Sequence, residues 1–530
     1  MSFNRMSVRA LQEKLNASDE LAFLDVREHG VHAQGHPLWA VPMPLSSLEL
    51  KVEILIPRKD VDIYLLDQGD GDNLSERAAA ILQVLGYTSL FIVEGGVTAW
   101  HAEGLEVFSG VNVPSKAFGE FVEHQCDTPH ISADDLAQKL ASGEAVTVLD
   151  SRPFAEFNRM SIPESIDMPG AELVHRVFET VPDETSLIVV NCAGRTRSII
   201  GAQSLINAGV KNPVMALKDG TMGWYLAGHD LARNETVVAG EPGDQAFQKS
   251  LQAARDVGSK CAVMCIDVSL LSELQGREDK TLFILDVRTN EEFLENHVAG
   301  SSHAPGGQLV QATDEYVAVR NATLVLVDDR EVRAWMTASW LKQLGWEDVF
   351  VLTDFSGCKM ENGEQVPTVE LKALEVSALE LDAVIASGEA AAVLDLSDSL
   401  SYRAGHIPGA FWAIRSRLEQ DLIFLPPVGY IVLTAEDVRL AHLAVDEVAR
   451  IRPDAIVHVL KDGNQGWRDA KLKIEEGDTS QLSRPDDIWY KPYDNKEKIR
   501  ERMQEYLDWE VALVPQVERD GTARFKILTE

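Results

Sequence analysis

Short apolar runs that end in aspartate occur four times along the chain. They lie at Phe23–Asp25, Val148–Asp150, Ile284–Asp286 and Val393–Asp395. About 40 residues beyond each aspartate a second apolar run follows, at Ile63–Leu66, Leu187–Val190, Leu324–Val327 and Tyr430–Leu433. Uninterrupted apolar runs of this length are typical of strands that are buried on both faces of a parallel sheet.

An amphipathic pattern follows each second run and predicts a helix, as in residues 198–208. Three copies then close with a glycine-rich turn before a tryptophan, at Glu94–Trp100, Lys218–Trp224 and Lys461–Trp467, whereas the third copy has only Thr353–Phe355 there. Strands that alternate with helices form βαβ crossovers. Each copy should therefore be one small α/β domain, a parallel sheet flanked by helices.

The repeat predicts four tandem domains followed by a tail. We expect these five parts at residues 1–112, 118–240, 250–365, 370–475 and 476–530. In the tail, a helix is expected from Asn495 to Leu507, and the Asp520-Gly521 pair between Val511–Val514 and Arg524–Leu528 indicates a hairpin. The tail has no catalytic pattern, so we expect a cap over apolar surface of a neighbouring domain or subunit.

Length and composition agree with several globular domains and narrow the choice of partners. A chain of 530 residues with 45% apolar and 25% charged residues can bury several cores, about three to five domains. The 84 acidic and 49 basic residues give a net charge of −35, which repels phosphate backbones and anionic lipid. We therefore expect neither nucleic acid nor a membrane as a partner.

The cysteines and the N-terminus favour a reducing cytosol. Five cysteines are too few and too scattered for a disulfide framework, and no stretch near Met1 has the length of a signal peptide. Cys261 and Cys265 stand four residues apart, but no histidine or second cysteine pair lies nearby to complete a zinc site. We expect no metal and no organic cofactor.

One loop carries the chemistry that the other copies lack. The second copy reads Val-Val-Asn-Cys-Ala-Gly-Arg-Thr-Arg-Ser from Val189 to Ser198, which places Cys192 between a buried strand and a helix. Successive N–H groups of such a loop converge into a partly positive nest that binds anions and lowers the pKa of a thiol. Gly194 permits the turn, and Arg195 and Arg197 add positive charge to a very acidic protein.

With these motifs the sequence resembles the rhodanese family of sulfurtransferases. The Asp-Val-Arg strand end, the Gly-His-Ile-Pro-Gly-Ala segment at Gly405–Ala410, the Cys-x-x-x-x-Arg loop and the closing glycine turn span about residues 1 to 475. The resemblance implies that Cys192 accepts a sulfur atom from a small anionic donor such as thiosulfate and passes the persulfide sulfur to a thiophilic acceptor such as cyanide or a thiol. The loop residues Ala193, Gly194, Arg195, Thr196, Arg197 and Ser198 would bind the donor.

The other three copies lack the cysteine. We place Asp67 and Asp329 at the equivalent position of the first and third copies, and Thr434 or Ala435 in the fourth. Aspartate cannot carry a persulfide and repels an anionic donor, so these copies should be catalytically inactive. The second copy itself departs from the family at Ser161, where histidine is expected.

Several residues are better explained by structure than by catalysis, and two other functions stay open. Asp150 and Arg152 recur as Asp-x-Arg in copies without the cysteine, which favours a structural ion pair, and Trp224 should be a packing residue.

A cysteine phosphatase or arsenate reductase of this fold would use a loop one residue longer. A non-catalytic scaffold or sulfur-relay protein is the other alternative. For either function, a homo-oligomer or a partner protein stays open.

Overall fold

The computed structural model describes residues 3–365, 369, 373–388 and 390–527, and has four mostly parallel sheets flanked by helices. In the second unit the strand order is β6-β10-β9-β7-β8. These strands are β6 (His130–Ile131), β7 (Val146–Asp150), β8 (Ile166–Asp167), β9 (Leu187–Asn191) and β10 (Val214–Leu217). The flanking helices are α7 (Ala133–Ser142), α8 (Phe154–Arg159), α9 (Glu172–Thr180), α10 (Thr196–Asn207) and α11 (Gly220–Leu226). This is the α/β architecture that the sequence predicts.

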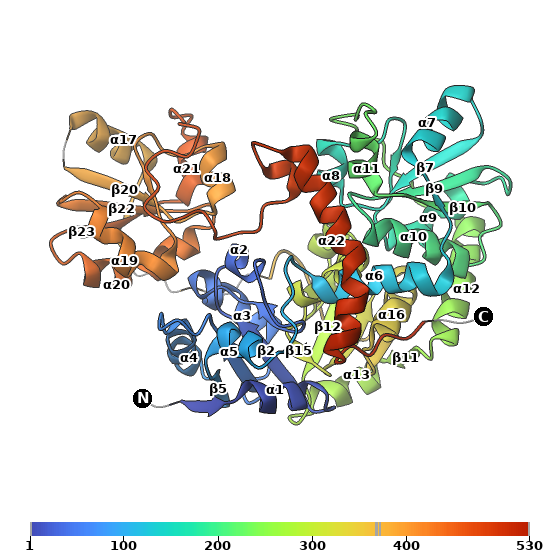
Figure 1. Ribbon diagram of the computed structural model, residues 1–530, viewed down its shortest axis with the longest axis horizontal. Coiled ribbons are helices and arrows are strands. Elements are labelled where there is room, and N and C mark those ends of the chain that lie inside the picture. Colours follow the sequence, from blue (N-terminus) through green and yellow to red (C-terminus); the bar gives the residue numbers. More distant parts are fainter. Residues whose placement is uncertain (1–2, 366–368, 370–372, 389, 528–530) are drawn as a thin grey trace.

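The other three sheets repeat this order (Figure 1). The first contains β1 (Asn4–Met6), β2 (Leu21–Asp25), β3 (Val41–Pro42), β4 (Asp62–Leu66) and β5 (Leu90–Val93). The third contains β11 (Met264–Asp267), β12 (Leu282–Asp286), β14 (Ser302–His303), β16 (Thr323–Val327) and β17 (Val349–Asp354). The fourth contains β19 (Glu375–Val376), β20 (Ala391–Asp395), β21 (Phe411–Trp412), β22 (Tyr430–Thr434) and β23 (Ile456–Leu460). In all four, the two predicted apolar runs are neighbouring parallel strands.

Helices cover the faces of these sheets as the crossovers require. In the first unit they include α1 (Val8–Leu15), α3 (Leu48–Leu55), α4 (Leu74–Val84) and α5 (Gly96–Ala102). In the third they include α13 (Val268–Gln275), α14 (Asn290–Glu295), α15 (Gly306–Gln311) and α16 (Val332–Leu344). In the fourth they include α17 (Ala378–Ser387), α18 (Ser399–Ala404), α20 (Val438–Ile451) and α21 (Gly463–Asp469). The longer helices α6 (Val113–Cys126) and α12 (Asp244–Lys260) connect the first three units.

The first three units share one hydrophobic core, whereas the fourth has its own. Leu65, Leu205 and Leu326, from three different units, belong to the same cluster of buried side chains. The third unit also supplies a strand to the first sheet, because β15 (Val319–Arg320) pairs antiparallel with β2, Val319 lying opposite Ala22. Such fusion fixes the first three units relative to one another.

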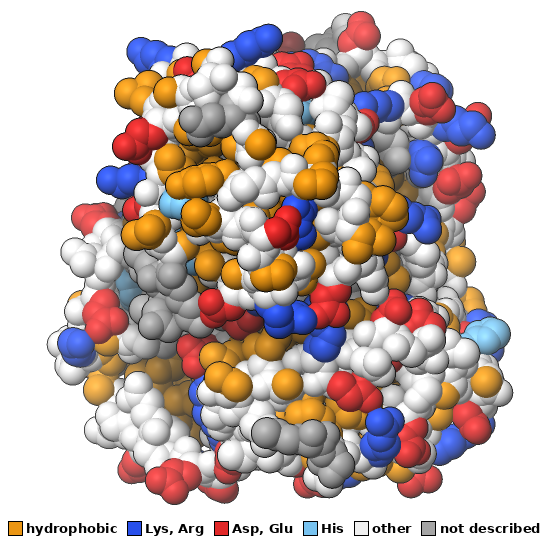
Figure 2. Space-filling model, turned by 90° about the vertical axis from the view of Figure 1, so that its left-hand side faces the viewer, with side chains coloured by type: hydrophobic (Ala, Val, Ile, Leu, Met, Phe, Trp, Pro, Cys, Tyr) orange, Lys and Arg blue, Asp and Glu red, His pale blue; other side chains and the backbone are white. Residues whose placement is uncertain are grey.

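The fourth unit leaves part of its apolar surface uncovered. Ile423, Phe424 and Ile456 are exposed large hydrophobic residues of this unit, with Ile423 73% exposed. Figure 2 shows hydrophobic side chains gathered on the upper part of the face to which the fourth unit contributes. Within the part of the chain that the structure describes, no helix is long and apolar enough to cross a membrane.

The tail differs from the sequence prediction. Helix α22 (Ile499–Asp520) runs through Val511–Val514, and Gly521, with a φ of 71°, ends it as a left-handed C-cap. The expected hairpin is therefore wrong, because the Asp520-Gly521 pair stops a helix instead of joining two strands. Residues 524–527 have no regular structure, and Leu528 lies outside the described residues. Figure 1 shows α22 crossing the centre of the molecule over α6.

Candidate functional site

Cys192 lies directly after β9, at the carboxyl end of the second sheet. The register pairs Asp150 of β7 with Asn191 of β9, so Cys192 is the first residue beyond the strand and precedes α10. The residue is 2% exposed. Its carbonyl oxygen accepts hydrogen bonds from the backbone N–H and the hydroxyl of Thr221, each 2.8 Å long. The sheet and the turn before α11 thus hold Cys192 from both sides.

Glycine in the turn before α11 allows that turn to pack closely against the Cys192 loop. Gly220 has a φ of 55°, and a Cβ there would lie 2.6 Å from the carbonyl oxygen of Gly194 and closer still to that of Cys192. At the equivalent Gly96 and Gly463, an added Cβ would collide in the same way with the carbonyl oxygens of Asp67 and Ala435. The recurring glycine is therefore a packing requirement between two loops, and it is present in units with and without the cysteine.

The backbone N–H groups around Cys192 are left without acceptors. Among the described residues, no hydrogen bond is made by the N–H groups of residues 193 to 198, which form the loop and the first turn of α10. The Cys192 thiol lies 3.5 Å from the Ser198 hydroxyl, which donates to the Arg195 carbonyl at 2.8 Å. Unpaired N–H groups at a helix N-terminus stabilise negative charge. This loop can therefore hold a thiolate, a persulfide or a bound anion.

Arg195 points into a set of carboxylates. Its guanidinium donates to both oxygens of Glu120, at 2.7 and 2.8 Å, and also binds Glu123 and, at 3.1 Å, Asp219. Burial acts to lower the pKa of Arg195, but these carboxylates raise it above its ordinary value. The side chain joins the loop to α6, where Glu120 is fully buried. Its charge is largely neutralised by the protein.

Arg197 has fewer acidic partners. It donates to the two oxygens of Glu156, at 3.2 and 2.9 Å, and to the Gln308 side chain at 3.3 Å. Burial acts to lower the pKa of Arg197, and Glu156 raises it. One carboxylate balances one guanidinium here, so the two predicted arginines have different surroundings.

Cys192 opens into a cavity of about 300 Å³ that four parts of the chain enclose. The first unit contributes His29, the third contributes Gln308 and Glu315, and the tail contributes residues from Trp489 to Tyr506. Besides the two arginines, Lys116 and Lys491 line it, against the two carboxylates of Glu156 and Glu315. Each of these basic groups also lies beside a carboxylate: Glu156 binds both Arg197 and Lys491, and Lys116 lies beside Glu510. The loop amides without acceptors among the described residues, and not a surplus of basic side chains, are therefore what this cavity offers an anion.

Helix α22 covers the loop from the outer side. A Cβ at Gly194 would lie 2.9 Å from the Glu510 carboxylate and 3.3 Å from the Tyr506 ring. Glu510 is fully buried and accepts hydrogen bonds from Thr196 at 3.2 Å and from Tyr506 at 3.0 Å. Lys116 lies 3.4 Å from the same carboxylate. No local sequence motif marks Lys116, Lys491 or Tyr506, so these residues of the cavity could not be predicted from the sequence.

Two of the other units fill the same loop with a carboxylate. In the first unit, Asp67 accepts hydrogen bonds from the N–H groups of Gly69, at 2.9 Å, and Ser75, at 3.1 Å. In the third unit, Asp328 accepts from the N–H groups of Arg330, at 3.1 Å, and Arg333, at 2.8 Å. The carboxylate takes the amides that Cys192 leaves free.

The sheet register corrects one of the expected equivalences and decides between the two alternatives of another. Asp286 of β12 pairs with Val327 of β16, so the next residue, Asp328 and not Asp329, occupies the position of Cys192. Asp395 of β20 pairs with Thr434, which places Ala435 at that position in the fourth unit. The strand register therefore defines which residue of each loop is equivalent to Cys192, whereas the loop sequences alone do not.

The residues expected to be structural are buried and paired. Asp150 and Arg152 form a fully buried ion pair of 2.7 Å. Trp224 is 4% exposed and donates to the Asp230 carbonyl at 2.9 Å. Cys265 is exposed, and the described residues contain no cluster of three or more histidine, cysteine, aspartate or glutamate side chains that could hold a metal ion.

Comparison with known proteins agrees with this architecture. The family model of the rhodanese-like domain matches residues 7–103, 132–227 and 268–355. The crystal structure of thiosulfate sulfurtransferase from Pseudomonas aeruginosa matches 99% of this chain and 100% of its own, with a TM-score of 0.94 and 42% identity. Similarity over the whole length includes the tail and the fourth unit.

Two curated proteins resemble parts of the chain. The "Putative sulfur carrier protein YrkF" of Bacillus subtilis is 23% identical over 193 residues, which are 34% of this chain and 91% of that protein. The "HTH-type transcriptional regulator Rv0324" of Mycobacterium tuberculosis is 34% identical over 98 residues, 18% of this chain and 42% of that protein.

We expect Gly220→Ala to disrupt the loop at Cys192 and to lower sulfurtransferase activity by at least tenfold. The new Cβ would collide with the carbonyl oxygens of Cys192 and Gly194. Gly209→Ala is the matched control, since Gly209 also has a positive φ, 72°, but open space around its Cβ position. Strain alone should cost the control about 1 kcal/mol of stability. Steady-state kinetics and thermal unfolding of both variants separate the two effects, and equal activity of the two would contradict this role for Gly220.

Proposed function

The chain belongs to the rhodanese-like domain family, and we propose that it is a sulfurtransferase whose single active site is built on Cys192. One observation carries this proposal: within the described part of the chain, the N–H groups of residues 193 to 198 have no acceptor, whereas aspartates accept from the corresponding amides in the first and third units. A thiolate or persulfide placed there gains hydrogen bonds that no side chain of the protein already uses.

The proposed reaction has two steps. The Cys192 thiolate attacks the outer sulfur of a donor such as thiosulfate, a sulfur–sulfur bond forms at Cys192, and the donor's own sulfur–sulfur bond breaks with its electron pair leaving on sulfite. A thiophilic acceptor such as cyanide or a thiolate then attacks the terminal sulfur and releases the Cys192 thiolate. The loop amides stabilise the negative charge that builds up on the persulfide and on the departing sulfite.

The lining of the cavity supports an anionic donor. Lys116, Arg197 and Lys491 place cationic N–H donors around the thiol, each beside a carboxylate. Together with the unpaired loop amides, these donors favour an anion at this cavity over the rest of a strongly acidic surface. We infer that the donor is small, because the cavity of about 300 Å³ must also admit the acceptor.

We propose that the units at residues 1–112, 250–365 and 370–475 and the tail at 476–530 serve architecture and not chemistry. The support is that His29, Gln308 and Lys491 line the cavity although each comes from outside the unit at residues 118–240. They would select the acceptor and shield the persulfide from water. The five-residue step from Cys192 to Arg197 argues against a cysteine phosphatase, which would need a longer loop for a tetrahedral oxyanion.

Cys192→Ser should abolish thiosulfate:cyanide sulfurtransferase activity and leave the fold unchanged. Serine has nearly the same shape, but its oxygen cannot carry a transferable sulfur. Cys126→Ser and Cys358→Ser are the controls and should keep most of the activity. Turnover and thermal unfolding decide the matter, and substantial turnover by the Cys192 variant would rule the proposed nucleophile out.

Arg197 and Arg195 should respond differently to replacement by glutamine. Arg197→Gln should raise the KM for thiosulfate about tenfold, in line with the loss of about 1 to 3 kcal/mol of charge-assisted hydrogen bonding. Arg195→Gln should instead destabilise the protein by about 3 kcal/mol, because it leaves the buried Glu120 without its partner. Arg159→Gln, an exposed arginine beside the tail, serves as the control. Unchanged kinetics in the Arg195/Arg197 double variant would mean that the amides bind the donor alone.

Asp67→Cys should not create a second active site. The replacement removes the carboxylate that holds Gly69 and Ser75, and the first unit has no pair of arginines in this loop. The test is turnover by a Cys192→Ser protein that also carries Asp67→Cys. Activity above that of Cys192→Ser alone would show that the first loop is still built for sulfur transfer.

A further inference from the structure

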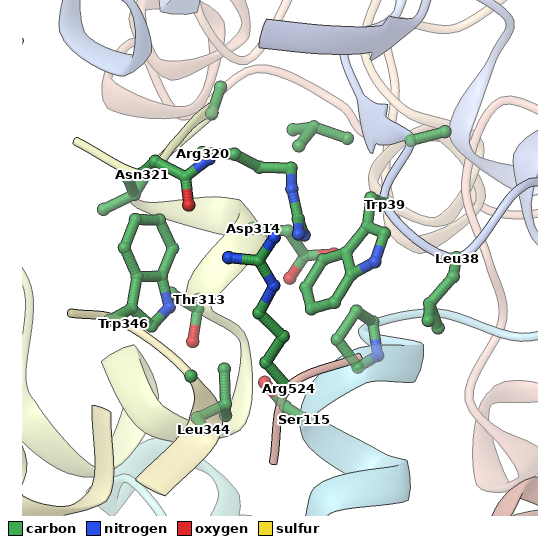
Figure 3. Close-up of a pocket in the computed structure, with 16 residues that line it drawn as sticks. Leu38, Trp39, Ser115, Thr313, Asp314, Arg320, Asn321, Leu344, Trp346 and Arg524 are labelled. Carbon is green, nitrogen blue, oxygen red and sulfur yellow. The ribbon is translucent and has the colours of Figure 1, made fainter. Parts of the chain in front are cut away.

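A second cavity lies between the first unit, the third unit and the end of the chain. It has a volume of about 60 Å³, and its lining includes Trp39 of the first unit, Arg320 and Trp346 of the third, and Arg524 beyond α22. Figure 3 shows the guanidinium groups of Arg320 and Arg524 pointing toward one another between the two tryptophans. Cys192 is not among the residues that line this cavity.

Neither guanidinium has a carboxylate partner among the described residues. Arg320 stacks on the Trp39 ring, with 3.7 Å from its central carbon to the ring centroid, and donates only a long hydrogen bond of 3.5 Å to the Leu15 carbonyl. Arg524 donates to the carbonyls of Asn16 and Ala17, the latter at 3.2 Å. A guanidinium has five N–H donors in a planar fork, so most of these donors remain available.

The nearby acidic groups are engaged elsewhere. Asp314 also lines the cavity, but its carboxylate accepts a hydrogen bond of 3.0 Å from Asn112, and burial raises its pKa. Asp520 is hydrogen-bonded to Thr522, and Thr522 in turn accepts from the Trp39 indole at 2.7 Å. Two positive charges therefore face each other without a salt bridge to either acid.

This arrangement is unlike that of the buried arginines of the protein. Among the described residues, every buried arginine lies within ion-pair distance of a carboxylate, and these are Arg27, Arg152, Arg176, Arg195, Arg288, Arg333 and Arg415. Burial and the charge of Arg524 lower the pKa of Arg320 to about 9. The repulsion between the two guanidinium groups lowers the stability of the folded protein unless an anion lies between them. The chain has 84 acidic residues, yet none of those described forms an ion pair with either arginine.

We propose that this cavity is a binding site for a small tetrahedral oxyanion of the sulfate or phosphate type, held by the forks of Arg320 and Arg524. Guanidinium groups bind such anions through paired hydrogen bonds. A volume of about 60 Å³ suits a group of about five heavy atoms, because about 10 to 15 Å³ of such cavity space is enough for one water molecule. The tryptophans exclude larger polar ligands and strengthen the electrostatic attraction by keeping water out.

Such an anion would join parts of the chain that also enclose the Cys192 cavity. Ser115 and Asp314 line the oxyanion cavity, whereas their sequence neighbours Lys116 and Glu315 line the cavity at Cys192. Arg320 belongs to β15, the strand that the third unit adds to the first sheet. Binding should therefore stabilise the joint between the first unit, the third unit and the tail, independently of whether Cys192 carries sulfur.

Thermal unfolding in sodium sulfate and in sodium chloride of equal ionic strength tests the site in the full-length protein. Sulfate stabilises most proteins by exclusion from their surface, so the readout is the difference between variants. Wild type and the control Arg277→Gln, an exposed arginine paired with Asp279, should gain about 2 °C more from sulfate than Arg320→Gln or Arg524→Gln. Phosphate should act like sulfate, and acetate should not. An equal gain in all four proteins would overturn the proposal.

Crystals soaked in selenate give a second test that does not depend on the variants folding. Selenium scatters anomalously, so a bound selenate would be located directly. The proposal requires an anomalous peak between Arg320 and Arg524 in the wild-type protein. A map with no peak there, including one with a peak only beside Cys192, would refute it.

Discussion

The structure depends on backbone N–H groups that converge on one residue in each unit, the residue directly after β4, β9, β16 or β22. All four units have this strand end in common. Where that residue is Asp67 or Asp328, its carboxylate accepts hydrogen bonds from the loop amides, so the nest is filled from within. Where it is Cys192, the amides of residues 193 to 198 have no acceptor among the described residues. Under the proposed function, what separates an inactive unit from a reactive one is therefore the atom that the loop amides face.

The other units matter because the loop at Cys192 does not enclose a cavity alone. Its cavity has walls from the first unit, the third unit and the tail, with Lys491 on the tail and Lys116 on α6. Both lysines lie beside a carboxylate, so the groups left without an acceptor among the described residues are the loop amides. Arg195, which the sequence suggested as an anion ligand, is instead joined to Glu120, Glu123 and Asp219. These contacts hold α6 against the loop, and under the proposed function Arg197 is the arginine left to bind the donor.

The sequence predicts the local parts of this arrangement well and the assembly poorly. The buried strands, the glycine turns and Cys192 follow from short patterns, because period and turn chemistry are local properties. The hairpin in the tail was wrong because Asp-Gly also ends helices, and only packing decides between the two. The partners of Arg195 and the addition of β15 to the first sheet join residues far apart in the chain, which no local pattern records. The shift from Asp329 to Asp328 needed the strand register.

The most direct test of the account is the location of a transferred sulfur atom. The full-length protein would be treated with thiosulfate whose outer sulfur carries a heavy isotope, and its five cysteines compared by peptide mass mapping. We predict one added sulfur per chain, on Cys192 alone, since this thiol lies at the loop whose amides have no acceptor among the described residues. Labelling of Cys126, Cys261, Cys265 or Cys358 to a similar extent, or no labelling of Cys192, would contradict the account.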